Sequence, residues 1–316
     1  MNGNNDYFKV LRPGINSTFQ DLGRRNLNHI GIPLSGAMDI RNYKIANQIV
    51  FNKDETVVEF AYQGPLLKYF GEKNIVCITG NVNFNIIRKN KVEKGQCYQS
   101  YIIEEGDQLD ILSTINSVYG YLSVGGGFKT DLFFGSSSTN IRAEVGGNNG
   151  KKIETNNILK ILSKKKLLQK KKLTYFDNKI EFIRVLKSTN FNYFSKDAKK
   201  KLFSETFQVS KLSDRMGMRL NGPNLQNIIN TNIKSEGIVK GVVQVPSDGN
   251  PIIMLSDHGT IGGYPKIANI ISADFDKISQ LPPGSKIKFK EVELKEAENL
   301  FYLYNIETQN LINQIN

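Results

Sequence analysis

The sequence predicts a mainly β protein with a few helices, organised as two domains. Between Val57 and Val124 the chain consists of short apolar or alternating runs separated by turn residues, a pattern typical of a barrel or sandwich. Further short β-type runs, such as KIEFIRVL and PIIML, follow residue 172. The length of 316 residues fits about two domains at roughly 150 residues each. We place them at 1–172 and 173–316 and allow for strands that exchange between the halves.

The first domain is expected to hold most of the strands. Val10 and Leu11 indicate a short strand, which a turn at Pro13-Gly14 follows. The later strands are expected in the segments VVEF, NIVCITG, VNFNI, YQSYII, QLDIL and VYGYLSV, with turns at 71–74, 88–95 and 104–107. In the second domain, IKFKEVEL is expected to return to strand after the last turn.

Helices are expected at four places. Apolar residues from Ile40 to Val50 recur at helical spacing, which predicts an amphipathic helix of about three turns. Ser195 is expected to cap a helix over KDAKKKLFSE, and Ser272 a short helix that ends before Pro282. The fourth helix is expected in the tail.

The tail carries a series of mostly apolar residues in steps of three and four. They are Leu294, Ala297, Phe301, Tyr304, Thr308, Leu311 and Ile315. This is the spacing of the a and d positions of a coiled coil, but Ala and Thr occupy two of them. The pattern therefore favours a terminal helix packed on its own domain over a helix that pairs with another chain.

The positive charge is concentrated in one segment. Residues 151–172 contain nine lysines and one glutamate, so they carry +8 of the net charge of +12. The segment has no arginine and no interleaved aromatic residues for base stacking. We therefore interpret it as a solvated lysine-rich linker, with attraction to polyanions as the less favoured alternative, and expect no nucleic-acid partner.

Other composition features exclude several classes of protein. Cys77 and Cys97 are the only cysteines, too few for a disulfide framework, and with two histidines they do not make a zinc site without carboxylates. We expect no structural metal. The sequence shows neither an apolar run of about 18 residues nor a signal-peptide pattern at its start. We expect a cytoplasmic protein without a membrane partner.

The segment DHGTIGGYPKIA, residues 257–268, has the highest density of reactive side chains. It contains three glycines and follows PIIML, which is predicted to be a buried strand. Glycines at such a position let backbone N–H groups approach a ligand, and Lys266 adds a positive charge. The alternative is an ordinary glycine-rich turn. No G-x-x-x-x-G-K-[ST] motif occurs, so a P-loop nucleotide site is excluded at the level of the motif.

Further polar segments accompany this loop. SDRMGMRLNGPNL starts at Ser213, and SEGIVKGVVQVPSDGNPIIML leads from Ser235 into the loop. In the first half, QDLGR and GIPLSGAMD are polar segments punctuated by glycine, and Glu59 precedes a Gly-Pro dipeptide. Together these strings, in this order and spacing, resemble the carboxyltransferase subdomain A and B family, also called allophanate hydrolase subunit 2. Its members include the C subunit of 5-oxoprolinase and part of urea carboxylase.

The resemblance covers nearly the whole chain apart from the linker and the tail. It implies two cyclophilin-like β-barrel subdomains with a cleft where they face each other. It also implies ATP-dependent opening of 5-oxoproline to glutamate, ADP and phosphate, together with two partner proteins that resemble the B and A subunits of 5-oxoprolinase. ATP would be bound by, or shared with, one of these partners. His258 stands where the family commonly has Arg, so we assign it no essential role.

The residue types of the expected cleft suggest roles. Arg215 and Lys266 are suited to bind a small anionic substrate, Arg215 by bidentate geometry and Lys266 as a point charge. Glu236, Asp214 or Asp257 is a candidate general base, although each could equally hold a loop by hydrogen bonds. We expect Lys266 to act with these three acids in catalysis. The expected substrate-binding residues are Arg215, Tyr264, Thr260, Gly262, Gly263, Ser35, Asp39 and Glu59.

Two other functions compete with the 5-oxoprolinase hypothesis. The chain could be the carboxyltransferase component of a biotin-dependent urea or amide carboxylase. It contains no Met-Lys-Met tripeptide, so we expect no covalent biotin on this chain and the carrier would be another protein. Alternatively, as for some relatives, it could be a non-enzymatic antagonist of a kinase inhibitor.

Overall fold

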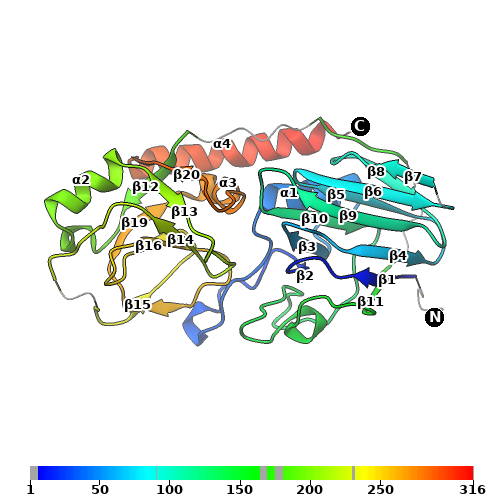
Figure 1. Cartoon of the computed structure of the whole chain (residues 1–316), viewed down its shortest axis with the longest axis horizontal. Coiled ribbons are helices and arrows are strands. Elements are labelled where there is room, and N and C mark those ends of the chain that lie inside the picture. Colours follow the sequence, from blue (N-terminus) through cyan, green and yellow to red (C-terminus); the bar gives the residue numbers. More distant parts are fainter. Residues whose placement is uncertain (1–5, 90, 164–168, 175–180, 230–231, 316) are drawn as a thin grey trace. The chain divides into compact units, whose positions relative to one another are not determined.

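The computed structural model describes residues 6–89, 91–163, 169–174, 181–229 and 232–315 (Figure 1). The chain divides into two compact units, which we treat separately. Unit 1 comprises residues 1–24, 35–176 and 308–316, and unit 2 comprises residues 25–34 and 177–307. Within the described ranges, no helix combines the length and the apolar character that crossing a membrane requires.

Unit 1 contains a six-stranded antiparallel sheet in the order β11-β1-β4-β9-β6-β7. Its strands are β1 (Tyr7–Arg12), β4 (Leu66–Phe70), β6 (Val82–Arg88), β7 (Lys91–Lys94), β9 (Gln108–Thr114) and β11 (Ile158–Lys160). Because side chains alternate across a strand, Phe8 and Val10 are fully buried while Tyr7 and Lys9 lie on the outer face.

A second sheet of unit 1 has five antiparallel strands in the order β2-β3-β10-β5-β8. They are β2 (Thr18–Gln20), β3 (Val57–Ala61), β5 (Asn74–Thr79), β8 (Ser100–Ile103) and β10 (Tyr119–Val124). Both sheets of unit 1 contribute to one apolar core, for example through Phe8, Phe60 and Phe84. Helix α1 (Ile40–Ile49) covers β5, where Ile45 and Ile49 pack with neighbouring apolar residues. The short η2 (Gly147–Gly150) completes the unit.

Unit 2 is built on an eight-stranded sheet in the order β20-β13-β14-β17-β16-β19-β12-β21. The strands are β12 (Ile183–Lys187), β13 (Phe207–Val209), β14 (Gly217–Asn221), β16 (Val242–Gln244), β17 (Ile252–Met254), β19 (Lys266–Ile270), β20 (Lys286–Ile287) and β21 (Phe289–Glu291). A separate two-stranded ribbon pairs β15 (Glu236–Gly237) with β18 (Ile261–Gly262). The predicted mainly β class is thus confirmed.

Apart from α4 (Leu294–Asn313), described below, the helices of unit 2 are short. They are η1 (Asn28–Ile30), η3 (Phe191–Tyr193), α2 (Lys196–Ser204), η4 (Ser272–Asp274) and α3 (Phe275–Ser279). The predicted cap of α2 is confirmed, because the Ser195 hydroxyl accepts a hydrogen bond from the Ala198 N–H at 3.0 Å. The predicted cap at Ser272 is wrong: Ser272 is the first residue of η4, whose N-cap is Ile271, and the N-cap of α3 is Asp274. Helix α3 still ends before Pro282, as predicted.

Helix α4 (Leu294–Asn313) confirms the predicted terminal helix. Its residues up to Glu307 belong to unit 2 and those from Thr308 to unit 1. Ala297 and Tyr304 pack with apolar residues of unit 2, and Leu311 packs with apolar residues of unit 1. The apolar stripe is therefore used mainly for packing within the chain, while Leu294 and Phe301 remain exposed.

The interpretation of residues 151–172 as a solvated linker is wrong for its described part. Leu159 and Ile161 are almost fully buried in the core of unit 1, and Ile153 joins them. β11 forms an edge strand on β1, and the Lys171 carbonyl accepts a hydrogen bond from the Ser100 N–H at 2.8 Å. Because lysines dominate this segment, its buried apolar residues were not recognised as parts of the core. Residues 164–168 lie outside the described residues.

Several strand assignments also differ from expectation, and β14, β16 and β19 of unit 2 were not predicted. The segment 88–95, predicted to be a turn, contains β7, which pairs with β6 as a hairpin. β7 is exposed along its length, so it has no apolar alternation by which it could be recognised. β4 was not predicted, although its residues alternate between buried and half-buried.

We predict that Leu159→Ala lowers the free energy of unfolding by about 3 kcal/mol, because it leaves a cavity in the core of unit 1. Leu162→Ala is the matched control, since Leu162 is exposed on the same segment. It should cost less than about 0.5 kcal/mol. Urea unfolding curves of the two variants measure the difference, and equal values would contradict the packing of this segment.

Candidate functional site

The loop that begins at Asp257 is tied to the segment around Arg215. The Asp257 N–H donates to the Arg215 carbonyl at 2.9 Å, and the Leu255 N–H donates to the Met216 carbonyl at 3.0 Å. These bonds extend the antiparallel pairing of β14 with β17, where Gly217 lies opposite Met254. The strand register therefore brings together two polar segments that are about forty residues apart in the sequence.

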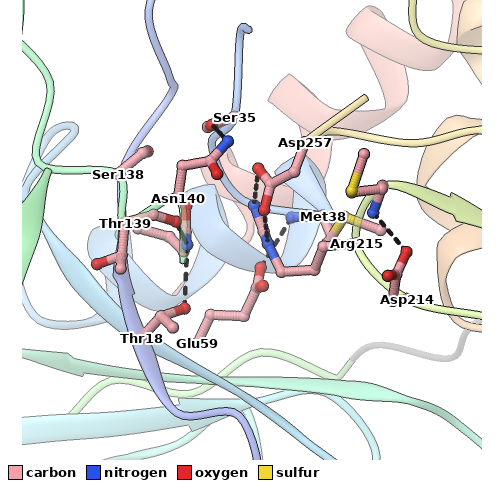
Figure 2. A network of polar contacts seen from close by, with 12 residues as sticks. Thr18, Ser35, Met38, Glu59, Ser138, Thr139, Asn140, Asp214, Arg215 and Asp257 are labelled. Carbon is pink, nitrogen blue, oxygen red and sulfur yellow. Dashed lines mark hydrogen bonds and ion pairs between the residues drawn. The ribbon is translucent and has the colours of Figure 1, made fainter. Parts of the chain in front are cut away.

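Arg215 and Asp257 form a bidentate ion pair. The Asp257 carboxylate accepts from Nε of Arg215 at 2.8 Å and from Nη2 at 3.1 Å. Figure 2 shows the guanidinium and the carboxylate facing each other. Their side chains are only 11% and 7% exposed, so the pair is largely shielded from water. Such a pair holds the guanidinium in a fixed orientation.

Asp214 makes its hydrogen bonds within its own loop. Its Oδ1 accepts hydrogen bonds from the N–H groups of Met216 at 2.9 Å and Gly217 at 3.1 Å. This is the way an aspartate stabilises a turn, here at the start of β14. The observed contacts of Asp214 thus match the structural alternative considered for it.

His258 is buried beside the ion pair. Its Nδ1 lies 2.6 Å from the Gly259 carbonyl oxygen. Since a carbonyl only accepts, Nδ1 carries the proton and Nε2 is the accepting nitrogen of the neutral ring. Burial lowers the pKa of His258, which favours this neutral form. The ring therefore adds no positive charge to this end of the loop at neutral pH.

Beyond His258 the loop forms the ribbon of β15 and β18. The Ile238 N–H donates to the Thr260 carbonyl at 2.9 Å, and Glu236 lies opposite Gly262. A Cβ at Gly262 would lie 2.3 Å from Cδ1 of Ile238, so a larger residue at this position would have to displace the end of that side chain. Tyr264 is exposed, and its carbonyl accepts from the Gln244 side chain at 3.2 Å. Gly263 accepts through its carbonyl from the Ile233 N–H at 2.7 Å.

Lys266 and Glu236 form the second ion pair. The ammonium of Lys266 contacts Oε2 of Glu236. The Lys266 side chain is 10% exposed and that of Glu236 is 42% exposed, so the cation is shielded while its carboxylate partner reaches solvent. The Lys266 N–H donates to Oδ1 of the buried Asn190 at 3.1 Å, which fixes the backbone at the start of β19.

The two ion pairs lie at opposite ends of the strands. Lys266 is aligned with Gln244, which is aligned with Ile252 at the start of β17. Arg215 and Asp257 lie beyond the other end of β17, roughly 13 Å away along the strand direction at about 3.3 Å per residue. The candidate site of unit 2 thus has an Arg215–Asp257 end and a Lys266–Glu236 end, connected by the loop 259–265.

In unit 1, Asp39 and Glu59 are buried and engaged by backbone groups. Asp39 caps α1 by accepting from the Asn42 N–H at 2.9 Å. Oε2 of Glu59 accepts from the Met38 N–H at 2.8 Å, and the Tyr121 hydroxyl accepts from the Asp39 N–H at 2.8 Å. Burial, with Glu59 and Asp39 nearby, raises the pKa of Tyr121. These groups hold the SGAMD segment in place at the start of α1.

Ser35 begins that segment in a left-handed conformation, with φ of 54°. A non-glycine residue in this region is uncommon, and such conformations cluster at functional sites. Its hydroxyl accepts from the Asn140 side chain at 3.1 Å, and Figure 2 shows the two side chains pointing toward each other. Ser35 is almost fully buried.

Asp21, in the QDLGR segment, organises a network that we did not predict. Its carboxylate accepts from the hydroxyls of Ser136, Ser137 and Ser138 and from the N–H groups of Gly23 and Ser137. These hydrogen bonds lower the pKa of Asp21, although burial acts in the opposite direction and is the largest single contribution. The run of hydroxyl residues in FGSSSTN was a signal that could have pointed to a buried acceptor.

Two clefts lie away from these residues. A cleft of about 410 Å³ in unit 2 is flanked by Asn224 and Ser247, and one of about 500 Å³ in unit 1 is flanked by Arg88 and Lys73. Neither is lined by a predicted site residue. No three His, Cys, Asp or Glu side chains of the described ranges gather in a way that could hold a metal ion.

Known proteins match the chain almost from end to end. Residues 30–291 match the family described as carboxyltransferase domain, subdomain A and B. The chain belongs to this family. It is 33% identical to the 5-oxoprolinase C subunit of Haemophilus influenzae over 90% of its own length and 91% of that protein. For the 5-oxoprolinase C subunit of Escherichia coli, identity is 31% and coverage is 92% of both chains.

A solved structure extends the comparison to larger members of the carboxyltransferase family. The crystal structure of the K. lactis urea amidolyase matches 96% of this chain with a TM-score of 0.87 and 25% identity, but the match spans only 20% of that protein. The family therefore includes both proteins of about the length of this chain and parts of much longer enzymes. The homologues of either length are parts of enzyme systems. This is consistent with an enzyme subunit.

Removing the charge of Asp21 tests the network in unit 1. Asp21→Asn should lower the free energy of unfolding at pH 7 by about 2–3 kcal/mol, because hydrogen bonds to a charged group are lost or weakened. Since the folded pKa is depressed, the stabilisation is present above the unfolded pKa of about 3.8 and is lost as pH falls toward the folded value.

Urea unfolding between pH 7 and pH 3 measures this effect. The stability of the wild type should fall more steeply below about pH 5 than that of Asp21→Asn. Asp131→Asn, at an exposed aspartate, is the control and should follow the wild type. Parallel pH profiles for the wild type and Asp21→Asn would contradict the assigned role.

The Arg215–Asp257 pair gives a second test. Asp257→Asn removes the carboxylate that binds the shielded guanidinium at two nitrogens, and should destabilise the protein by about 3 kcal/mol. The exposed Lys201–Asp197 pair of α2 is the matched control, so Asp197→Asn should cost less than about 1 kcal/mol. Thermal or urea unfolding compares the two, and a loss at Asp257 no larger than that at Asp197 would refute this account.

Proposed function

We propose that this chain is one component of an ATP-dependent 5-oxoprolinase and acts with two partner proteins that resemble the A and B subunits of that enzyme. The complex would convert 5-oxoproline and ATP to glutamate, ADP and phosphate. The observation that supports this most is the match in length as well as sequence: the chain and the 5-oxoprolinase C subunit of H. influenzae cover each other by 90% and 91%. We further propose that it acts in the cytoplasm, where ATP is available.

The chemistry explains why cationic groups would be needed. An unstrained lactam is a poor electrophile, and transfer of the terminal phosphoryl group of ATP to its oxygen would make the carbon a better target for water. Water adds to that carbon, the ring C–N bond breaks, and the nitrogen takes up a proton. A second water molecule releases the phosphate. Negative charge develops on oxygen throughout, and fixed cations stabilise it.

Within this proposal the Lys266–Glu236 pair is the favoured catalytic end of the loop. Lys266 is shielded from water, so its charge acts through a medium of low polarity. Glu236 is the more exposed partner and can reach a guest in solution, which makes it the favoured general base among the acids considered. An anionic substrate would approach Lys266 beside Glu236, or would displace the Glu236 carboxylate from the ammonium.

The remaining predicted residues would have supporting roles. The Arg215–Asp257 pair would orient the other end of the loop, and Asp214 would hold the turn before β14. The loop would contact the substrate through Thr260, Tyr264, Gly262 and Gly263. In unit 1, the SGAMD segment would be held in place by Ser35, Asp39 and Glu59. ATP would be bound by a partner protein or shared with it.

Carboxyl transfer is the second candidate. It is supported by the TM-score of 0.87 with a urea amidolyase over 96% of this chain. In that function the Lys266–Glu236 end of the loop would receive carboxybiotin from a separate carrier protein and pass the carboxyl group to urea or a related amide. Because the match spans only 20% of the urea amidolyase, the remaining activities would have to come from other chains.

Reconstitution tests the proposed function. The chain is mixed with the purified A-like and B-like partner proteins, 5-oxoproline and ATP, and glutamate and ADP are measured. We expect glutamate only when all three proteins are present. Lys266→Met should lower the rate about a hundredfold, as expected for loss of one charge-stabilising group, whereas Lys266→Arg should retain part of it. Glu236→Gln should also lower the rate.

Lys286→Met is the control, because Lys286 is an exposed lysine of the same unit. It should leave the rate unchanged. If the three wild-type proteins together form no glutamate, the 5-oxoprolinase proposal is refuted. Carboxylation of urea when carboxybiotin on a carrier protein replaces ATP would instead support the second candidate.

A further inference from the structure

The outer face of the six-stranded sheet in unit 1 carries a group of lysines and aromatic rings. β1 contributes Tyr7 and Lys9, β4 contributes Lys68 and Phe70, and β11 contributes Lys160. All five are half-buried or exposed, whereas the residues between them, such as Phe8 and Tyr69, are buried. We refer to these five residues as the lysine–aromatic face.

The strand register sets these side chains next to one another. Lys9 lies directly opposite Lys68, and Tyr7 lies between Lys160 on one side and Phe70 on the other. The rings of Tyr7 and Phe70 stack at a centroid distance of 5.0 Å with an interplanar angle of 14°. The Lys68 ammonium lies 5.4 Å from the centroid of the Phe70 ring. Within the described chain, none of the three lysines forms an ion pair.

This arrangement is unfavourable in the isolated chain. Like charges directly opposite each other on neighbouring strands destabilise a sheet. Two acids near this face are engaged elsewhere: Asp110 pairs with Arg12 at 3.0 Å, and Glu105 accepts from the Gly71 N–H beyond the end of β4. A face that holds three unpaired cations around an aromatic centre is therefore complementary to negative charge.

We propose that the lysine–aromatic face docks an acidic segment of a partner protein. The stacked aromatic pair would form the apolar centre of the contact, and the three lysines would bind carboxylates around it. The inference rests on the proposed function in one respect, because it takes the partner to be the B-like or the A-like protein of the 5-oxoprolinase. It also gives the described part of the lysine-rich segment a role, since Lys160 belongs to it.

The geometry favours a protein over single-stranded nucleic acid as the occupant. Binding of single strands relies on open aromatic faces on which bases stack. Here Phe70 is stacked on Tyr7 and is also contacted by the Lys68 ammonium, and both rings are half-buried. The rings therefore act as a packed apolar centre, and the lysines supply the positive charge around it.

Charge reversal at Lys9 separates docking from stability. Lys9→Glu converts the like-charged pair with Lys68 into an opposite pair, so the isolated chain should unfold at a higher urea concentration. The same change should weaken binding to the partner protein about tenfold, because a carboxylate would then face a carboxylate. A purely structural role predicts no loss of binding in a variant that is more stable.

The experiment measures binding of the full chain to the purified B-like and A-like partner proteins by calorimetry, without ATP or 5-oxoproline. Lys160→Glu is a second variant, at an exposed position of the edge strand. Lys200→Glu on α2 is the control with the same charge change. We expect weaker binding for the first two variants only, and wild-type affinity that falls with ionic strength.

The outcomes are distinct. Unchanged affinity in Lys9→Glu and Lys160→Glu would overturn the docking face and leave the proposed function standing. Tight binding of oligo-dT that these variants abolish, with partner binding unaffected, would overturn the acidic protein as occupant. Absence of any complex with the wild-type chain would overturn both proposals. A complex that forms but does not hydrolyse 5-oxoproline would overturn only the proposed function.

Discussion

The cost of removing charge from water is the constraint on which the candidate site depends. An ionised side chain below the surface requires a partner or several hydrogen bonds. Unit 2 satisfies this with two ion pairs, Arg215 with Asp257 and Lys266 with Glu236. Unit 1 satisfies it at Asp21 with hydroxyl and backbone donors. In each case the partners come from distant parts of the sequence, so the pairing also fixes the loops that carry the charges.

Local signals in the sequence predicted the mainly β class and the strands with a clear apolar pattern. Strands with a clear apolar pattern, such as β5 and β10, and the capped helix α2 were recognised because their patterns are complete within a few residues. β7 was missed because it is exposed, and β11 because lysines surround its one buried residue, Leu159. Both are strands of the sheet edge, whose formation depends on a neighbouring strand rather than on their own composition.

The site was predictable as residue types but not as pairs. Arg215, Asp257, Glu236 and Lys266 were recognised from polar segments, yet their pairing follows from the register of β14 on β17 and of β15 on β18, which no local pattern specifies. The same holds for Asp21, whose donors are more than a hundred residues away. The separation of the two ion pairs along the strands is likewise a consequence of register.

On the proposed function, these pairs would also explain how one family can be associated with two chemistries. Opening a lactam and carboxylating an amide both place negative charge on oxygen atoms near an amide carbon, and a fixed ammonium or guanidinium stabilises that charge in either case. Neither pair supplies the activated group, which is a phosphoryl donor in one reaction and a carboxylated carrier in the other. On the proposed function, this chain stabilises charge, and the partner that docks on it decides which donor arrives.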